Sequence, residues 1–200
     1  MQRRAWIHSQ GATGVADGLA QQTQTGEWPE TLDVQALLGQ GWRPTPFREF
    51  ILKIHSRCNL SCDYCYMYEM ADQGWRRQPR KMAKHTVDWA AKRIAEHAHA
   101  KLLNRIDITL HGGEPLLAGV EHLRYTIAAV RAACGPDVDV RFNVQTNGVL
   151  LDRTFLELFL EQDVRVGVSL DGDEEGHDRH RRWANGNGSF KAVRAGLHRL

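Results

Sequence analysis

Three cysteines stand close together early in this chain. Cys58, Cys62 and Cys65 follow one another at the spacing C-x3-C-x2-C, and Tyr64 directly precedes the third of them. A [4Fe–4S] cluster is normally held by cysteine thiolates, one on each iron. Three cysteines would therefore leave one iron free to bind another molecule, and an open coordination position is typical of a reactive metal site. The spacing favours a cluster of this kind.

Two simpler interpretations of the cysteine loop also apply. Structural zinc sites usually combine two Cys or His pairs that lie a dozen or more residues apart, and the sequence has no second pair at that distance. A zinc site made of the three cysteines and one of the ten histidines stays open as an alternative. A disulfide framework is disfavoured because three of the four cysteines crowd into one loop. The remaining thiol, Cys134, is interpreted as structural or idle.

Glycine-rich and polar motifs follow later in the chain. They are Gly112-Gly113-Glu114-Pro115, Thr146-Asn147-Gly148 and Ser169-Leu170-Asp171-Gly172. Two glycines without Cβ atoms let the backbone approach a ligand closely, and a carboxylate such as Glu114 can accept a hydrogen bond from a ligand ammonium. Taken singly, each motif is also what an ordinary turn contains.

Hydrophobic periodicity predicts the elements that position these motifs. Alternating apolar residues predict strands, and apolar residues at helical spacing predict helices. The predicted strands cover residues 47–54, 105–110, 138–144 and 164–170. The predicted helices cover residues 84–100, a stretch around 123–130, residues 155–160 behind an N-cap at Asp152, and residues 190–200 behind an N-cap at Ser189.

This alternation predicts the fold class. Strands that alternate with helices form a parallel sheet with right-handed crossovers, so we expect an α/β fold. The chain contains three to four βα units. This number indicates a partial (β/α) TIM-like barrel, and we expect it to be the N-terminal half of a longer fold. Every unusual motif follows the carboxyl end of a predicted strand, where such folds place their sites.

Polar residues occupy one parity of the second, third and fourth predicted strands. They are Asp107, Thr109, His111, Arg141, Asn143, Gln145, Arg165, Ser169 and Asp171. Because successive side chains point to opposite faces, these residues are expected to share the inner face of the sheet. Parallel strands that are packed on both faces are apolar throughout. We therefore expect a lumen that holds water or a ligand.

The first part of the chain differs from the rest. Residues 11–26 are rich in Gly, Gln, Thr and Ala and lack apolar periodicity, which predicts disorder. A short helix is predicted around residues 31–38, and Gly39 and Pro44 stop anything longer. We interpret residues 1–45 as a disordered N-terminal extension and residues 46–200 as the core domain.

Composition excludes several classes of function. Charged residues make up 25% and hydrophobic residues 42% of the chain, which is typical of a globular domain. A net charge of +2 does not favour a nucleic-acid partner. No apolar stretch approaches the roughly 20 residues of a membrane span, and residues 1–10 do not read as a secretory signal. Cysteines kept reduced for a metal fit a cytoplasmic location.

Together the motifs resemble the radical S-adenosylmethionine (SAM) superfamily, from about Phe47 to Leu200. The likeness rests on the cysteine triplet with its aromatic residue, the Gly-Gly-Glu-Pro motif and the Ser-Leu-Asp-Gly motif. Closer matches are residues 62–69, 71–76, 111–117, 145–151, and 167–172 with 177–182. These resemble the FxsB-type radical SAM/SPASM peptide maturases, which form cyclophane crosslinks. Anaerobic sulfatase maturases are a more distant likeness.

The resemblance implies a radical SAM core and two cofactors, a [4Fe–4S] cluster and SAM. Cys58, Cys62 and Cys65 would hold the cluster, and SAM would bind its open iron. The residues that would bind SAM are Tyr64 near the adenine, Gly112, Gly113 and Glu114 at the amino group, Asn147, Ser169 and Asp171 at the nucleoside, and Arg181 at the carboxylate. The resemblance assigns no residue of this chain to the chemical step itself.

The resemblance also implies a reaction. Reductive cleavage of SAM gives a 5′-deoxyadenosyl radical that removes hydrogen from a ribosomally made precursor peptide, and the product carries a carbon–carbon crosslink. A flavodoxin or ferredoxin would donate the electron. The alternatives are a sulfatase-maturase-like oxidation of Cys or Ser and a non-enzymatic iron–sulfur or zinc module. The SPASM region of such enzymes supplies further cysteines that this chain lacks, so residues 46–200 are expected to be the N-terminal part of a longer core.

Overall fold

The computed structural model describes residues 33–200, and the chain divides into two units, Met1–Thr45 and Pro46–Leu200. In the first unit, α2 (Val34–Gly39) begins after Asp33, whose Oδ1 accepts a hydrogen bond from the Ala36 N–H at 2.9 Å. A short helix therefore lies where one is predicted. The predicted disorder of residues 11–26 lies outside the described residues.

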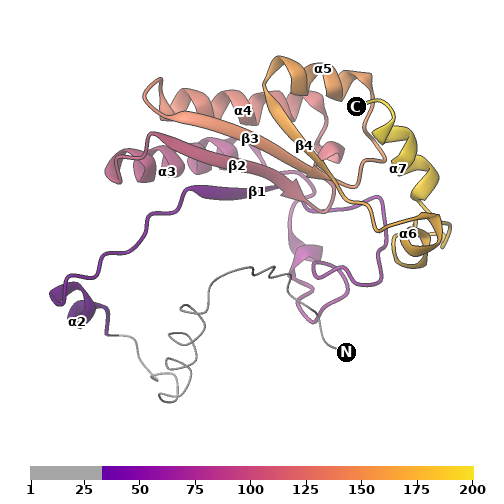
Figure 1. Cartoon of the computed structure of the whole chain (residues 1–200), viewed down its shortest axis with the longest axis horizontal. Helices are drawn as coiled ribbons and strands as arrows, with labels where there is room; N and C mark the ends of the chain where they lie inside the picture. Colours follow the sequence, from indigo (N-terminus) through magenta and orange to yellow (C-terminus); the bar gives the residue numbers. More distant parts are fainter. Residues whose placement is uncertain (1–32) are drawn as a thin grey trace, which may run out of the picture. The chain divides into compact units, whose positions relative to one another are not determined.

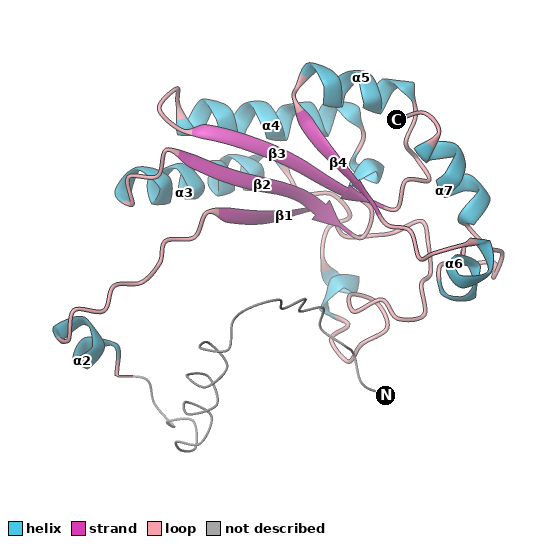
Figure 2. Ribbon diagram, viewed as in Figure 1, coloured by secondary structure: helices cyan, strands magenta, loops and turns pink. Residues whose placement is uncertain are grey.

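Four parallel strands form the sheet of the second unit (Figure 1). They are β1 (Glu49–His55), β2 (Arg105–Gly112), β3 (Asp139–Thr146) and β4 (Val164–Val168), in the order β1-β2-β3-β4. The crossovers contain α3 (Lys84–Ala100), α4 (Val120–Cys134) and α5 (Arg153–Glu161). Figure 2 shows these helices along one face of the sheet. This arrangement confirms the α/β class and a partial barrel.

The two faces of the sheet differ as the strand parity predicts. Ile106, Ile108 and Leu110 of β2 are fully buried and belong to the core under the helices, as do Val140, Phe142 and Val144 of β3. On the opposite face, Thr109 pairs with Asn143 in register. A cavity of about 500 Å³ lies there, lined by Thr109, His111, Asn143, Gln145 and Arg165 among others. We call these five residues the polar face.

Two short helices follow β4. α6 (Glu174–His180) begins after Asp173, whose side chain accepts a hydrogen bond from the Gly176 N–H. α7 is Phe190–Leu197. β4 ends at Val168, two residues earlier than predicted, although the Ser169 N–H still donates to the Thr146 carbonyl of β3 at 2.9 Å. None of the helices in residues 33–200 is long and apolar enough to cross a membrane.

The two predicted N-caps have different outcomes. Asp152 Oδ1 accepts a hydrogen bond from the Phe155 N–H at 3.1 Å, which confirms its capping role. Ser189 stands at the N-cap position of α7 as predicted, but its side chain does not cap the helix, because its hydroxyl donates to the Arg181 carbonyl at 2.7 Å instead. Asp178 replaces it and accepts a hydrogen bond from the Phe190 N–H at 2.8 Å.

Candidate functional site

The three loop cysteines lie around one pocket of about 210 Å³ beyond the carboxyl ends of the strands. They belong to the segment between β1 and α3, and all three are half-buried. The loop folds through local bonds, since the Cys65 N–H donates to the Cys62 carbonyl at 3.1 Å and the Glu69 N–H donates to the Cys65 carbonyl at 2.9 Å. The structure therefore brings together the residues that the spacing selects.

The surroundings of the thiols fit an iron–sulfur cluster. The Leu60 N–H points at Cys58 Sγ at 3.4 Å, and Asn147 Nδ2 lies 3.6 Å from the same sulfur. Hydrogen bonds to sulfur are among the features that tune such clusters. Within residues 33–200, no three Cys, His, Asp or Glu side chains are grouped as a single metal ion would need. A cluster places each thiolate on a different iron, so it does not require that convergence.

Burial governs the acidity of two of these thiols, Cys58 and Cys62. It raises the pKa of Cys58 to about 11, against the opposing effect of the Leu60 N–H. It also raises the pKa of Cys62, where the positive charge of Arg181 opposes the shift. Both shifts favour the neutral form of the Cys58 and Cys62 thiols when no metal is bound. A bound metal deprotonates its thiol ligands outright, because the cation compensates the buried negative charge.

The glycine pair after β2 forms another part of the pocket wall. Gly112 has a φ of +151°, in the region that favours glycine, and a Cβ there would collide with the His55 carbonyl. The Gly113 N–H donates to the His55 carbonyl at 2.9 Å, and the Glu114 N–H donates to the Arg57 carbonyl at 2.9 Å. The end of β2 is thus bonded directly to the beginning of the cysteine loop.

Glu114 is fully buried and does not line the pocket. Its Oε1 accepts hydrogen bonds from the Leu116 N–H at 2.9 Å and the Thr146 hydroxyl at 2.7 Å, and its Oε2 accepts one from the Asn147 N–H at 2.8 Å. Burial raises the pKa of this carboxyl, although all three bonds oppose the shift. Its oxygens face the protein, so the side chain holds the end of β3 in place.

Asn147 and Ser169 both line the pocket. Asn147 Nδ2 donates to Asn59 Oδ1 at 2.8 Å, and its Oδ1 accepts a hydrogen bond from the Val149 N–H at 3.0 Å. Ser169 Oγ accepts a hydrogen bond from Gln145 Nε2 at 2.9 Å. Gln145 and His111, which the strand parity also places on the inner face, line the same pocket. The polar face therefore continues into the pocket.

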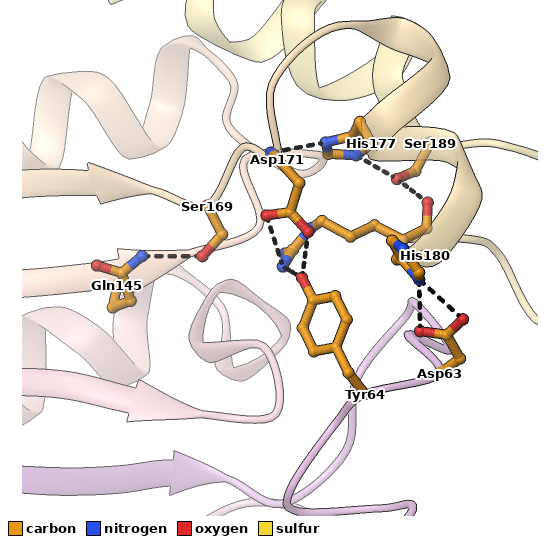
Figure 3. A network of polar contacts seen from close by, with 9 residues as sticks. Asp63, Tyr64, Gln145, Ser169, Asp171, His177, His180 and Ser189 are labelled. Carbon is orange, nitrogen blue, oxygen red and sulfur yellow. Dashed lines mark hydrogen bonds and ion pairs between the residues drawn. The ribbon is translucent and has the colours of Figure 1, made fainter. Parts of the chain in front are cut away.

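Tyr64 and Asp171, which lie side by side in Figure 3, form a hydrogen-bond network with Arg181. The Tyr64 hydroxyl donates to Asp171 Oδ2, and Arg181 Nη1 donates to the Tyr64 oxygen at 2.8 Å. Burial raises the pKa of Tyr64, and its bond to Asp171 raises it further. Asp171 does not line the pocket, whereas Tyr64 and Arg181 do. Arg181 Nε is buried, and it has no hydrogen-bond partner among the described residues.

A second pair joins the same two segments. His180 Nδ1 lies 3.0 Å from Asp63 Oδ2, and the Ser61 N–H donates to the Arg182 carbonyl at 2.7 Å. With the Tyr64 network, these bonds hold the cysteine loop against the end of α6. We call this set of contacts the loop clamp.

His177 supports the loop clamp from behind, and sequence reasoning missed it. It is fully buried, its Nε2 lies 2.9 Å from the Ser189 hydroxyl, and its Nδ1 accepts a hydrogen bond from the Asp171 N–H at 3.4 Å. Because the Ser189 hydroxyl donates to the Arg181 carbonyl, Nε2 carries the ring proton. The one feature of the sequence that points to His177 is its position at the start of the 177–182 motif.

Comparisons with known proteins agree with this geometry. The family model for the Radical SAM superfamily matches residues 52–200. The cysteine-type anaerobic sulfatase-maturating enzyme of Clostridium novyi is 31% identical over 138 residues, which cover 69% of this chain and 36% of that protein. The serine-type anaerobic sulfatase-maturating enzyme of Bacteroides thetaiotaomicron is 31% identical over 156 residues, which cover 78% of this chain and 36% of that protein.

A solved structure also matches. "Native anSMEcpe with bound AdoMet and Kp18Cys peptide" aligns with a TM-score of 0.65 at 27% identity, over 77% of this chain and 40% of that one. This chain therefore spans little more than a third of the length of the two curated relatives.

Proposed function

This chain belongs to the radical SAM superfamily, and on that premise we propose that it contributes the cofactor-binding core of an enzyme that cleaves SAM at a [4Fe–4S] cluster. One observation carries the proposal. Cys58, Cys62 and Cys65 share a pocket with the glycine pair, Asn147, Ser169 and Arg181, at the carboxyl ends of four parallel strands. This is where folds of parallel strands bind their ligands.

Cys58, Cys62 and Cys65 are the proposed cluster ligands. When bound, the cluster and SAM together supply a 5′-deoxyadenosyl radical through one-electron cleavage of the sulfonium. The chain itself binds and orients the cofactors and excludes water from them. Tyr66, Met67 and Tyr68 line the same pocket and give it an apolar wall beside the thiols.

The other pocket residues suit the parts of SAM. The buried, unpartnered Nε of Arg181 supports a role in binding the carboxylate. Gly112 and Gly113 line the pocket, and their backbone is proposed to bind the amino group. Asn147 and Ser169 are proposed to line the nucleoside.

Tyr64, Glu114 and Asp171 make hydrogen bonds that stabilise the cofactor pocket, and each also has a proposed role toward SAM. Tyr64, with an exposed ring at the mouth of the pocket, is proposed to contact the adenine. Asp171 is proposed to act at the nucleoside side through its bond to Tyr64. Glu114 is proposed to act on the amino group indirectly, because its carboxylate positions residues 146 and 147.

For the substrate we propose a ribosomally made precursor peptide, and for the product a cyclophane-type carbon–carbon crosslink. The support is the similarity of residues 62–69, 71–76, 111–117 and 145–151 to maturases of that type. The solved relative with a bound peptide supports the substrate class. A flavodoxin or ferredoxin is the proposed electron donor.

A second candidate is oxidation of a Cys or Ser side chain in a protein substrate. The two curated sulfatase-maturating relatives favour it. Mass spectrometry of co-expressed substrates separates the two candidates. A crosslinking enzyme removes two hydrogens from the precursor peptide and joins two of its residues, whereas a maturase of the second kind alters a single side chain and leaves no crosslink.

Electron paramagnetic resonance of the anaerobically reconstituted protein tests the shared part of both candidates. SAM should change the spectrum of the reduced cluster, because it binds the open iron. Cys62→Ala should lose the signal, whereas Cys134→Ala, which removes the remaining thiol, should keep both the signal and its response to SAM. A spectrum that SAM leaves unchanged would instead indicate a plain iron–sulfur or zinc module.

A further inference from the structure

A second, larger pocket lies beside the cofactor pocket. Its volume is about 640 Å³, and its walls come from Lys53 of β1, from Ser56 directly after that strand and from residues 66–86. Tyr66 and Met67 line both pockets, so these two side chains separate the larger pocket from the one that holds the cysteines. A molecule in the larger pocket therefore lies next to the proposed cofactors without displacing them.

The walls of this pocket combine apolar and cationic groups. Tyr66, Met67, Trp75 and Met82 supply aromatic and thioether surface, while Lys53, Lys81 and His85 supply positive or protonatable groups. The Lys81 ammonium donates to the Ala118 carbonyl at 3.0 Å, so Lys53 is the lysine that can pair with a ligand. Lys53 Nζ lies 5.6 Å from the centre of the Tyr66 ring. Within the described part of the chain, no carboxylate lies within ion-pair distance of Lys53.

The chain segment that supplies much of this wall also carries mostly positive charge. Residues 76–85 contain five Arg or Lys residues and His85 but no Asp or Glu. Asp72 is the one acidic residue among those that line the pocket. Such a surface attracts an anionic partner and repels a cationic one.

Hydrogen bonds hold the wall of this pocket in one conformation. The Ser56 N–H donates to the Arg80 carbonyl at 2.8 Å, and the Met82 N–H donates to the Ile54 carbonyl at 3.0 Å, so residues 80–82 pair with the end of β1. Arg57 Nη1 donates to the Trp75 carbonyl at 2.9 Å, and Trp75 packs edge-on against Tyr68 with 4.8 Å between ring centres. A wall that is already ordered costs less to bind against.

We propose that this pocket binds the peptide substrate and takes an aromatic or long apolar side chain that stands next to an acidic residue. Tyr66, Trp75 and Met82 receive the apolar group, and Lys53 pairs with the carboxylate. The neighbouring peptide residues then reach the cofactor pocket across Tyr66 and Met67. This inference rests on the proposed function and adds a charge preference to its peptide substrate.

Fluorescence anisotropy of the reconstituted full chain with SAM tests the inference. The probes are two fluorescein-labelled glycine–serine peptides that differ only in carrying Phe-Asp or Phe-Lys at their centre. The Phe-Asp peptide should bind at least about tenfold more tightly, and its binding should weaken as salt is added, since salt screens exposed charges.

Variants locate the binding. Lys53→Glu should weaken binding of the Phe-Asp peptide about tenfold and should strengthen binding of the Phe-Lys peptide. Lys101→Glu makes the same charge change at the exposed C-terminal end of α3 and should change neither. Circular dichroism verifies that both variants are folded. Equal binding of the two peptides, binding of neither, or indifference to Lys53→Glu overturns the inference.

The two proposals fail in distinguishable ways. If the wild-type spectrum does not respond to SAM, the proposed function is wrong. If it does respond but the peptides show no charge preference, only the peptide pocket is wrong.

Discussion

Gly113 shows how closely the backbone approaches itself at the pocket. A Cβ at this position would collide with the Tyr68 hydroxyl and would lie 2.5 Å from the backbone C and O atoms of Arg57. The hydroxyl could swing away with its side chain, whereas the Arg57 carbonyl is held by the Glu114 N–H. The requirement for glycine at position 113 therefore comes chiefly from the nearby backbone of Arg57.

We predict that Gly113→Ala lowers the free energy of unfolding by about 1–3 kcal/mol, the usual cost of overpacking. Urea denaturation measures it. Gly39→Ala, with nothing within 4 Å of the new Cβ, is the matched control and should be nearly neutral. Adding Tyr68→Phe to Gly113→Ala should restore little of the lost free energy of unfolding. Full restoration would show that the hydroxyl, and not the Arg57 backbone, is the obstacle.

At the scale of residues, the sequence predicts which side chains lie near the pocket but not which hydrogen bonds each of them makes. The cysteine spacing and the glycine pair identify pocket residues directly, because short loops leave little freedom. Glu114 differs, since its partners Thr146 and Asn147 are 32 and 33 residues away. No local pattern reveals that a carboxylate next to a glycine pair turns inward.

At the scale of elements, the corner between β4 and α6 carries most of the departures from prediction. β4 stops at Val168, α6 forms within a stretch without apolar periodicity, and Ser189 bonds to a distant carbonyl instead of capping its helix. Each departure has the same cause. Tertiary hydrogen bonds around Asp171 and Arg181 outweigh local preference, whereas helices with long apolar faces, such as α3, match their predicted bounds.

His177 makes this corner sensitive to pH. Its pKa is lowered from 6.5, chiefly by burial and also by the Arg181 charge, while Asp171 and Asp178 oppose the shift. The unfolded chain therefore binds a proton more readily than the native one, and stability falls as pH drops below about 6.5. Protonation also removes the acceptor that Nδ1 offers to the Asp171 N–H.

Thermal unfolding between neutral and mildly acidic pH measures this dependence. His177→Gln cannot take up the proton, so it should be less stable at neutral pH and should lose less stability on acidification than the wild type. The control His198→Gln, at an exposed site after α7, should follow the wild-type curve. A His177→Gln curve parallel to the wild type would contradict the assignment.

At the scale of the whole molecule, the unit Pro46–Leu200 contains its own core. A cluster of buried apolar side chains runs from Leu52 to Val164 and includes residues from all four strands. The sequence predicts this unit because long periodic segments alternate regularly. It does not predict the rest of such a barrel, since the aligned residues cover only 36% of each of the two curated relatives.

We predict that a chain beginning at Pro46 folds and keeps its response to SAM. Its thermal unfolding midpoint should lie within a few degrees of that of the full chain, because every buried hydrophobic residue that the structure describes lies at position 52 or later. Circular dichroism and paramagnetic resonance measure the two properties. A large drop in the midpoint would show that residues 1–45 stabilise the unit.

The loop clamp has a consequence for biosynthesis. Tyr64 and Asp171 are 107 residues apart, and Asp63 and His180 are 117 apart, so the three thiols leave the ribosome long before the residues that will hold their loop. Until then the three thiols belong to an unfolded segment of the nascent chain, where oxidants can reach them. Insertion of iron and sulfide into a finished loop is therefore an event that follows translation of residue 182.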